Sequence, residues 1–82
     1  MTESDEFNWQ QLININPKIL GGKPVIKGTR VPLQVILGAL AGGSSISEVC
    51  KSYRITEEDV RAALAYAAEM LSQERVYAIS RG

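Results

Sequence analysis

The chain lacks histidine altogether and has a single cysteine among its 82 residues. One cysteine cannot form a disulfide within the chain, which is typical of proteins that work in a reducing cytosol. Without histidine or a cysteine cluster, a metal site would have to consist of carboxylates, and no carboxylates show metal-ligand spacing. The sequence therefore predicts no metal and no other cofactor.

Long hydrophobic runs are also missing. No segment approaches the roughly 20 apolar residues of a membrane-spanning helix, and the acidic residues 1–5 lack the apolar core of a secretory signal. No nucleophile stands near a base in a catalytic pattern, and the glycine-rich phosphate loop is absent. We therefore expect a cytoplasmic protein that is not an enzyme, makes no membrane contact and takes no small-molecule substrate.

Positive charge is not in excess, because nine basic residues offset nine acidic ones. The chain as a whole thus lacks the polycation character of many nucleic-acid-binding proteins. Its charges are unevenly placed, with three acids in the first six residues and four of the nine basic residues between positions 18 and 30. We expect residues 1–10 to form an acidic, partly flexible N-terminus and residues 11–80 to form one domain.

Residues 16–33 carry most of the information in the sequence. They contain all three prolines, three of the seven glycines and a net charge of +4. Because glycine permits backbone bends that other residues resist, we expect turns at Gly21, Gly22 and Gly28. Residues 18–30, here called the cationic segment, are either a partner-binding surface or a solvated strand edge whose lysines prevent aggregation.

The hydrophobic pattern predicts a mainly α fold, a three-helix core with a short β-containing N-terminal arm. Apolar runs at 12–15 and 25–26 favour a two-stranded ribbon in an arm of residues 11–31, packed on the helices or on a second chain. Helical spacing of apolar residues predicts helices near 32–42, 46–53 and 57–75. The glycines at 42 and 43 should end the first helix, and capping boxes beginning at Ser45 and Thr56 should start the other two.

Several apolar side chains are expected to form the core. On the first and second helices these are Leu33, Ile36, Leu37 and Leu40, then Ile46, Val49, Cys50 and Tyr53. On the third helix the expected buried face consists of Val60, Ala63, Leu64, Ala67 and Leu71. The aromatic residues Phe7 and Trp9 should pin the N-terminus to this core or cover a subunit interface.

The second and third predicted helices have the spacing of a helix-turn-helix, in a homeodomain-like set of three helices, although plain three-helix packing explains it too. A recognition helix presents its first turn to DNA bases, and here that turn is Glu57-Glu58-Asp59, which phosphates would repel. Arg61 is the nearby hydrogen-bond donor. Candidate residues for a partner or nucleic-acid surface are therefore Lys18, Lys23, Lys27, Thr29, Arg30 and Arg61. Arg30 could fork onto a carboxylate of this chain or of a partner.

The pattern Gly-Gly-Lys-Pro-Val-Ile-Lys-Gly-Thr-Arg-Val is followed by an Ile-Leu-x-x-Leu helix and by Thr-Glu-Glu-Asp-Val-Arg-Ala-Ala-Leu-Ala-Tyr-Ala. Over residues 13–68 the chain thereby resembles the small bacterial and archaeal family called domain of unknown function 433, departing from it at Ile46, where many members have proline. The resemblance implies a VapB-like antitoxin with a helix-turn-helix core that neutralises a PIN-like nuclease toxin and autoregulates its operon.

The small size of the core adds an expectation of oligomerisation, and we predict a homodimer formed through the N-terminal arm. Two functions from other classes stay open beside the antitoxin. One is a stand-alone DNA-binding transcriptional regulator, and the other is a structural dimerisation module.

Overall fold

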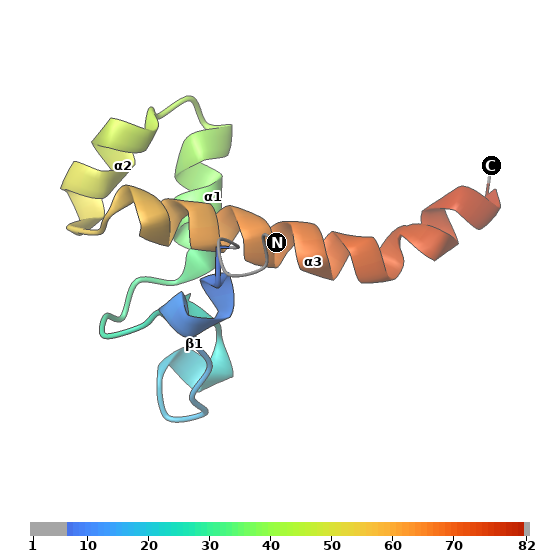
Figure 1. The fold of residues 1–82 in the computed structure, drawn as a ribbon, viewed down its shortest axis with the longest axis horizontal. Coiled ribbons are helices and arrows are strands. Elements are labelled where there is room, and N and C mark those ends of the chain that lie inside the picture. The colour runs from blue at the N-terminus through green and yellow to red at the C-terminus, as the bar shows by residue number, and fades with distance from the viewer. Residues whose placement is uncertain (1–6, 82) are drawn as a thin grey trace.

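The computed structural model describes the backbone of residues 7–81 and the side chains of residues 7–73, so the expected flexibility of the first residues lies outside the described part. Three helices follow a short arm, α1 (Leu33–Ala41), α2 (Ile46–Tyr53) and α3 (Glu57–Arg81) (Figure 1). The arm contains the 3-10 turns η2 (Trp9–Leu12) and η3 (Leu20–Gly22) and the strands β1 (Ile13–Asn14) and β2 (Val25–Ile26). The mainly α, three-helix fold with a β-containing arm is thus confirmed, and α3 runs beyond its expected end at 75.

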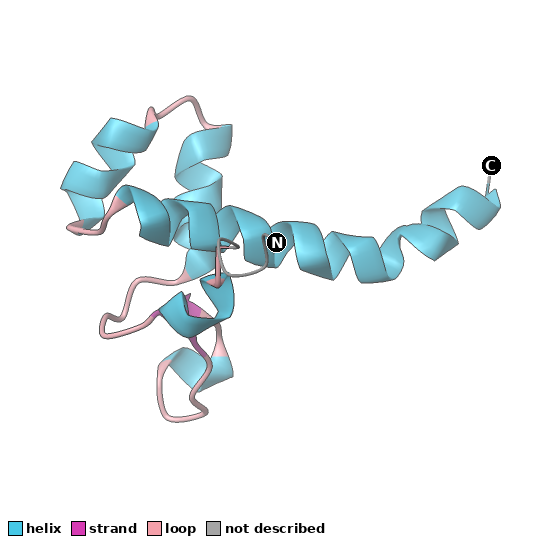
Figure 2. Cartoon of the chain, in the orientation of Figure 1, coloured by secondary structure: helices cyan, strands magenta, loops and turns pink. Residues whose placement is uncertain are grey.

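The two strands form the predicted ribbon. Ile13 lies opposite Ile26 and Asn14 opposite Val25 in an antiparallel pair (Figure 2). Val25 and Ile26 are both buried, and Ile26 belongs to the same apolar cluster as residues from all three helices. A ribbon this short gains stability only by packing on another element. Here it packs on the helices of its own chain, so it does not need a second chain.

The end of α1 and the start of α2 follow the local sequence signals. Gly43 adopts φ +107°, a value that a side chain would resist. Its N–H donates to the carbonyl of Leu40, and the N–H of Ser44 donates to that of Ala39, each at 3.0 Å, which together form a Schellman motif. The predicted end of α1 is therefore fixed by hydrogen bonds between backbone groups that are close in the sequence.

Capping boxes begin both α2 and α3. The Ser45 N–H donates to a Glu48 carboxylate oxygen at 2.8 Å, and the Glu48 N–H donates to the Ser45 hydroxyl at 3.0 Å. At the start of α3 the Thr56 N–H donates to Asp59 at 3.0 Å, and the Asp59 N–H donates to the Thr56 hydroxyl at 3.1 Å. The reciprocal bonds satisfy N–H groups that the helix itself leaves free.

The turn between α2 and α3 contains a residue that sequence reasoning missed. Arg54 ends α2 in the left-handed conformation, with φ +58° and ψ +49°. Glycine is the usual residue at such a position, because a Cβ atom is strained there. The Ile55 N–H nevertheless donates to the Cys50 carbonyl at 3.1 Å, which closes the helix end. Arg54 thus holds a sharp turn at some conformational cost.

The core lies where the arm and the three helices meet, and its buried members are Ile26, Leu33, Ile36, Val49, Ile55, Val60 and Ala63. Leu37, Leu40, Cys50 and Tyr53 pack against this cluster as half-buried residues.

The expected buried face of α3 is wrong at two leucines. Leu64 is 44% exposed and Leu71 is 64% exposed, whereas Ala62 and Ala63 are fully buried. Ala63 belongs to the same cluster as residues of α1 and α2, and α3 then continues past the other elements (Figure 1). Val60 and Ala63 of the same expected face are buried, so the prediction is right there and wrong only at the two leucines. Ile46 departs from expectation in the same way, because it is 42% exposed at the start of α2.

Candidate partner-binding surface

The last part of the cationic segment is a loop held by one side-chain hydroxyl. Thr29 donates from its hydroxyl to the Ile26 carbonyl at 2.7 Å and accepts the Val31 N–H at 3.0 Å. Gly28 allows the turn with φ +81°. Thr29 is half-buried, while Lys27 and Arg30 beside it are exposed. The Thr29 hydroxyl therefore stabilises the loop, and the side chains of Lys27 and Arg30 remain exposed at the surface.

The first part of the cationic segment lies in the connection between β1 and β2. Three consecutive residues have positive φ, Leu20 at +50°, Gly21 at +68° and Gly22 at +91°, so the predicted turn glycines are in turn conformations. The Asn16 side chain accepts the backbone N–H of Lys18 at 2.8 Å and steadies the entry to the turn. Lys18 and Lys23 are exposed on either side of it.

The four arm cations therefore form two pairs at opposite ends of a short ribbon. One pair, Lys18 and Lys23, lies in the loop that joins the strands. The other pair, Lys27 and Arg30, lies in the loop that follows β2 (Figure 1). The Lys27 N–H donates to the Leu12 carbonyl at 2.8 Å, which ties the second loop to the start of the arm. The four cations, here called the cationic surface, are thus spread along the arm, and backbone hydrogen bonds hold their loops in place.

Arg61, the sixth candidate, is not part of this cationic surface. Its guanidinium lies over the Phe7 ring, 4.2 Å from the ring centre, in a cation–π contact. Nearby, the rings of Trp9 and Tyr66 meet edge to face with centres 6.0 Å apart. Of the two roles expected for these aromatic residues, a contact with the core is confirmed for Trp9, because Tyr66 packs against the core. The other role, at a subunit interface, stays a prediction. Sequence reasoning missed both partners, because they lie far from Phe7 and Trp9 in the chain.

The start of α3 remains acidic at the surface. Glu57 and Glu58 are exposed, and Asp59 is half-buried in its capping box. The carboxylates stabilise the helix, because the free N–H groups of its first turn give that end a partial positive charge. The same turn would meet DNA phosphates with like charge if α3 entered the major groove. The helices α2 and α3 follow one another across a short turn, and the first turn of α3 is acidic.

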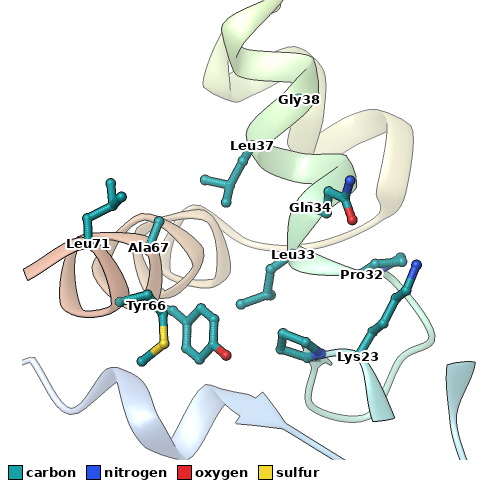
Figure 3. A pocket seen from close by; sticks show the side chains of 11 residues that line it. Lys23, Pro32, Leu33, Gln34, Leu37, Gly38, Tyr66, Ala67 and Leu71 are labelled. Atoms are coloured by element: carbon teal, nitrogen blue, oxygen red, sulfur yellow. The ribbon is translucent and has the colours of Figure 1, made fainter. Parts of the chain in front are cut away.

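An open apolar groove separates α1 from the middle of α3, with a volume of about 600 Å³. It is lined by Lys23, Pro24, Pro32, Leu33, Gln34, Leu37, Gly38, Tyr66, Ala67, Met70 and Leu71. In Figure 3 Leu33 and Leu37 point from α1 into the space beside Ala67 and Leu71 of α3. Sequence reasoning did not find this groove, because it placed Leu71 in the core.

Metal clusters and membrane-spanning helices are both missing from the described residues. Within that part of the chain, no three side chains of the metal-ligating acidic and cysteine types come together. Nor is any helix in it both long and apolar enough to cross a bilayer.

Residues 13–67 match the model of a family described as "Protein of unknown function (DUF433)". That match covers most of the chain. The chain belongs to the DUF433 family. The sequence-based recognition of the family is confirmed. The antitoxin function that the resemblance implies stays a prediction.

Three relatives place this DUF433 protein among known proteins. It is 34% identical over 59 residues to the uncharacterized protein y4eO of Sinorhizobium fredii (strain NBRC 101917 / NGR234), a match that covers 71% of this chain but 27% of y4eO. The chain thus spans about a quarter of that relative. A DUF433 member from Anabaena variabilis ATCC 29413 has a crystal structure with a TM-score of 0.71 at 31% identity, covering 84% of this chain and 70% of that one. The crystal structure of Rv2018 from Mycobacterium tuberculosis gives a TM-score of 0.62 at 28% identity, and the match covers 68% of this chain and 27% of Rv2018.

Proposed function

We propose that this DUF433 protein is a cytoplasmic, antitoxin-like binding module that masks a PIN-like nuclease and contributes to the control of its own operon. The observation that carries the proposal is the set of four exposed cations on the arm, Lys18, Lys23, Lys27 and Arg30. The active sites of PIN-type nucleases are clusters of acidic residues that hold metal ions. A cationic surface therefore has an electrostatic reason to approach such a site.

The local structure of the arm favours binding through Arg30. A planar guanidinium can donate two parallel hydrogen bonds to one carboxylate, which a lysine ammonium cannot do. The loop that presents Arg30 is already fixed by the two hydrogen bonds of the Thr29 hydroxyl. A loop that is ordered before binding loses less conformational entropy when the partner arrives. Arg30 is accordingly the residue that we assign the largest share of the interaction.

A second candidate function is a stand-alone DNA-binding regulator. It is favoured by the arrangement of α2, the turn and α3, and by the exposed cations Lys51 and Arg54 at the end of α2. Phosphate contacts of this kind position a protein on DNA without reading its sequence. The exposed acids Glu57 and Glu58 oppose base reading by α3. We therefore rank DNA binding below nuclease masking. Within the first proposal, DNA binding serves only the control of the protein's own operon.

Inhibition of the nuclease encoded by the neighbouring open reading frame tests the proposal. Arg30→Ala should weaken inhibition by roughly tenfold to a hundredfold, because a charge-assisted hydrogen bond contributes about 1.5–3 kcal/mol. Arg30→Lys should restore little of it, since lysine lacks the planar fork. Lys51→Ala is the matched control, an exposed cation away from the arm, and should inhibit like the unchanged protein. Equal inhibition by the Arg30→Ala variant would refute the assignment.

A further inference from the structure

Leu20, in the connection between β1 and β2, has a backbone conformation that leucine resists. Its φ is +50°, and Gly21 and Gly22 follow it with φ +68° and +91°. A Cβ atom is strained in this region, so glycine or asparagine at position 20 would form the turn more easily. Strained residues of this kind are kept where the surrounding structure or a function requires them. The reason for a leucine at this position therefore has to lie in its side chain.

The side chain of Leu20 gains little from its own chain. It is 44% exposed, and Leu20 is neither in the buried core cluster nor among the half-buried residues that pack against that cluster. An exposed leucine is common on protein surfaces and needs no explanation by itself. A leucine that is both exposed and strained is a different case, because a polar residue that accepts positive φ would avoid both penalties. The side chain of Leu20 is therefore suited to a contact outside this chain.

The surroundings of Leu20 are apolar and cationic. Residues 15–24, which join the two strands and are here called the arm tip, also contain Ile15, which is 56% exposed. Lys18 and Lys23 are exposed on either side of Leu20, and residues 15–24 contain no acid. In Figure 1 the arm tip, coloured light blue to cyan, projects from the body on the far side from α2. The arm tip thus presents exposed apolar side chains together with positive charge.

Hydrogen bonds fix the arm tip before any partner binds. The Ile19 N–H donates to the Asn16 carbonyl at 2.8 Å, and the Gly22 N–H donates to the Ile19 carbonyl at 2.9 Å. The Asn16 side chain accepts the Lys18 N–H at 2.8 Å. Because the turn is already formed, presenting Leu20 to a partner requires little further ordering of the backbone.

We propose that Leu20 is an anchor side chain that enters an apolar pocket of the nuclease, while Lys18 and Lys23 pair with acidic residues at the rim of that pocket. The inference rests on the proposed masking of a nuclease and gives that interface a second contact besides Arg30. An apolar centre with a polar rim is the ordinary composition of a protein interface. Arg30 lies in the loop that follows β2, so the nuclease contacts the arm at both ends of its ribbon.

Charge separates this partner from two others. A second copy of the chain that paired tip to tip across a two-fold axis would bring lysines of like charge together. An anionic membrane would attract the lysines, but two apolar side chains and two cations hold a protein only weakly at a bilayer. A nuclease whose active site is a cluster of acids offers the opposite charge on a folded surface.

The dissociation constant for the nuclease of the neighbouring open reading frame tests the anchor. Leu20→Asn removes the apolar side chain, and asparagine tolerates the left-handed conformation, so the turn should stay intact. This change should raise the dissociation constant about tenfold, while the thermal midpoint of the free protein stays level or rises. Ile46→Asn is the matched control and should bind like the unchanged protein, because Ile46 is 42% exposed but lies at the start of α2.

The binding kinetics separate the anchor from the lysines. Leu20→Asn should act by raising the dissociation rate constant, because a buried contact is lost. Replacing Lys18 and Lys23 together by alanine should instead lower the association rate constant in low salt and much less in high salt, since exposed charges steer the encounter. An unchanged dissociation rate constant for Leu20→Asn would overturn the anchor.

Failure of this inference is distinct from failure of the proposed function. If Arg30→Ala weakens nuclease binding and Leu20→Asn does not, the anchor is wrong and the masking of the nuclease stands. If the unchanged protein does not bind the nuclease, both are overturned. Binding to vesicles of phosphatidylserine and phosphatidylcholine that Leu20→Asn abolishes would assign the arm tip to a membrane and overturn the nuclease contact. A dimer of the free protein that Leu20→Asn dissociates would assign the arm tip to a second copy and overturn it as well.

Discussion

The guanidinium of Arg61 lies 4.2 Å from the centre of the Phe7 ring and so joins α3 to the residues that precede η2. Five residues further along α3, the rings of Tyr66 and Trp9 meet edge to face with centres 6.0 Å apart. These two contacts hold the start of the described chain against α3. They also hold Arg61 at Phe7, away from the two loops that carry the cations of the arm.

Replacing Phe7 by leucine should lower the free energy of unfolding by about 0.5–1 kcal/mol beyond the loss of apolar area, because the cation–π contact is lost. A double-mutant cycle with Arg61→Gln isolates that coupling, measured by urea unfolding of the four proteins. A coupling energy indistinguishable from zero would show that the two side chains lie together without stabilising the fold.

Large-to-small changes should separate the buried core from the exposed leucines of α3. Ile36→Ala should cost roughly 2–5 kcal/mol of unfolding free energy, because Ile36 is fully buried. Leu64→Ala should cost much less, about 1 kcal/mol or below, in conditions where the protein is monomeric. Denaturant midpoints at low protein concentration measure both. Equal losses would mean that α3 packs with a different face towards α1 and α2.

Arg54→Gly should stabilise the protein by up to about 1 kcal/mol, because glycine adopts the left-handed conformation without strain. Arg54→Ala is the control, since it removes the same charge and keeps the Cβ atom. Thermal unfolding should show a higher midpoint for the glycine variant and no gain for the alanine variant. A gain shared by both variants would trace the effect to charge instead of backbone conformation.

Thr29→Val should lower the free energy of unfolding by about 0.5–1.5 kcal/mol, because the part-buried Val31 N–H loses its hydroxyl acceptor, while the Ile26 carbonyl keeps the Thr29 N–H. Thr29→Ser keeps the hydroxyl and should stay close to the unchanged protein. Hydrogen exchange of the Val31 amide measures the effect at its source. Equal exchange rates in the valine and serine variants would rule out a structural role of the hydroxyl.

Local signals in the sequence predicted the end of α1 and the starts of α2 and α3 well. Gly43, the Ser45 box and the Thr56 box act through bonds between neighbouring residues, so the sequence alone contains what determines them. The ribbon was predicted for a similar reason, because its two apolar runs flank a turn rich in glycine. Contacts such as that of Arg61 with Phe7 depend on how α3 lies across the arm, and no local pattern reveals it.

The burial of the two leucines of α3 was the main error, and its cause is physical. Alanines occupy much of the helix between 62 and 68, so apolar periodicity is compatible with more than one buried face. The structure buries Ala62 and Ala63 and exposes Leu64 and Leu71. In the candidate site the cations were predicted as one group, whereas the ribbon places them in two loops. Sequence order shows that the four cations are close along the chain. It does not show at which end of the ribbon each one lies.

The affinities of the protein for the nuclease and for DNA, measured separately, test the central claim most directly. The dissociation constants of the protein for the neighbouring-gene nuclease and for duplex DNA of its own operator are measured at one salt concentration. They are compared between the unchanged protein, Arg30→Ala and the double change Glu57→Gln with Glu58→Gln, which leaves the Asp59 cap in place. We predict that Arg30→Ala weakens nuclease binding at least about tenfold, while the double change leaves nuclease binding unaltered and strengthens non-specific DNA binding by removing repulsion. Nuclease binding that is indifferent to Arg30→Ala, together with operator binding that the double change abolishes, would contradict the account.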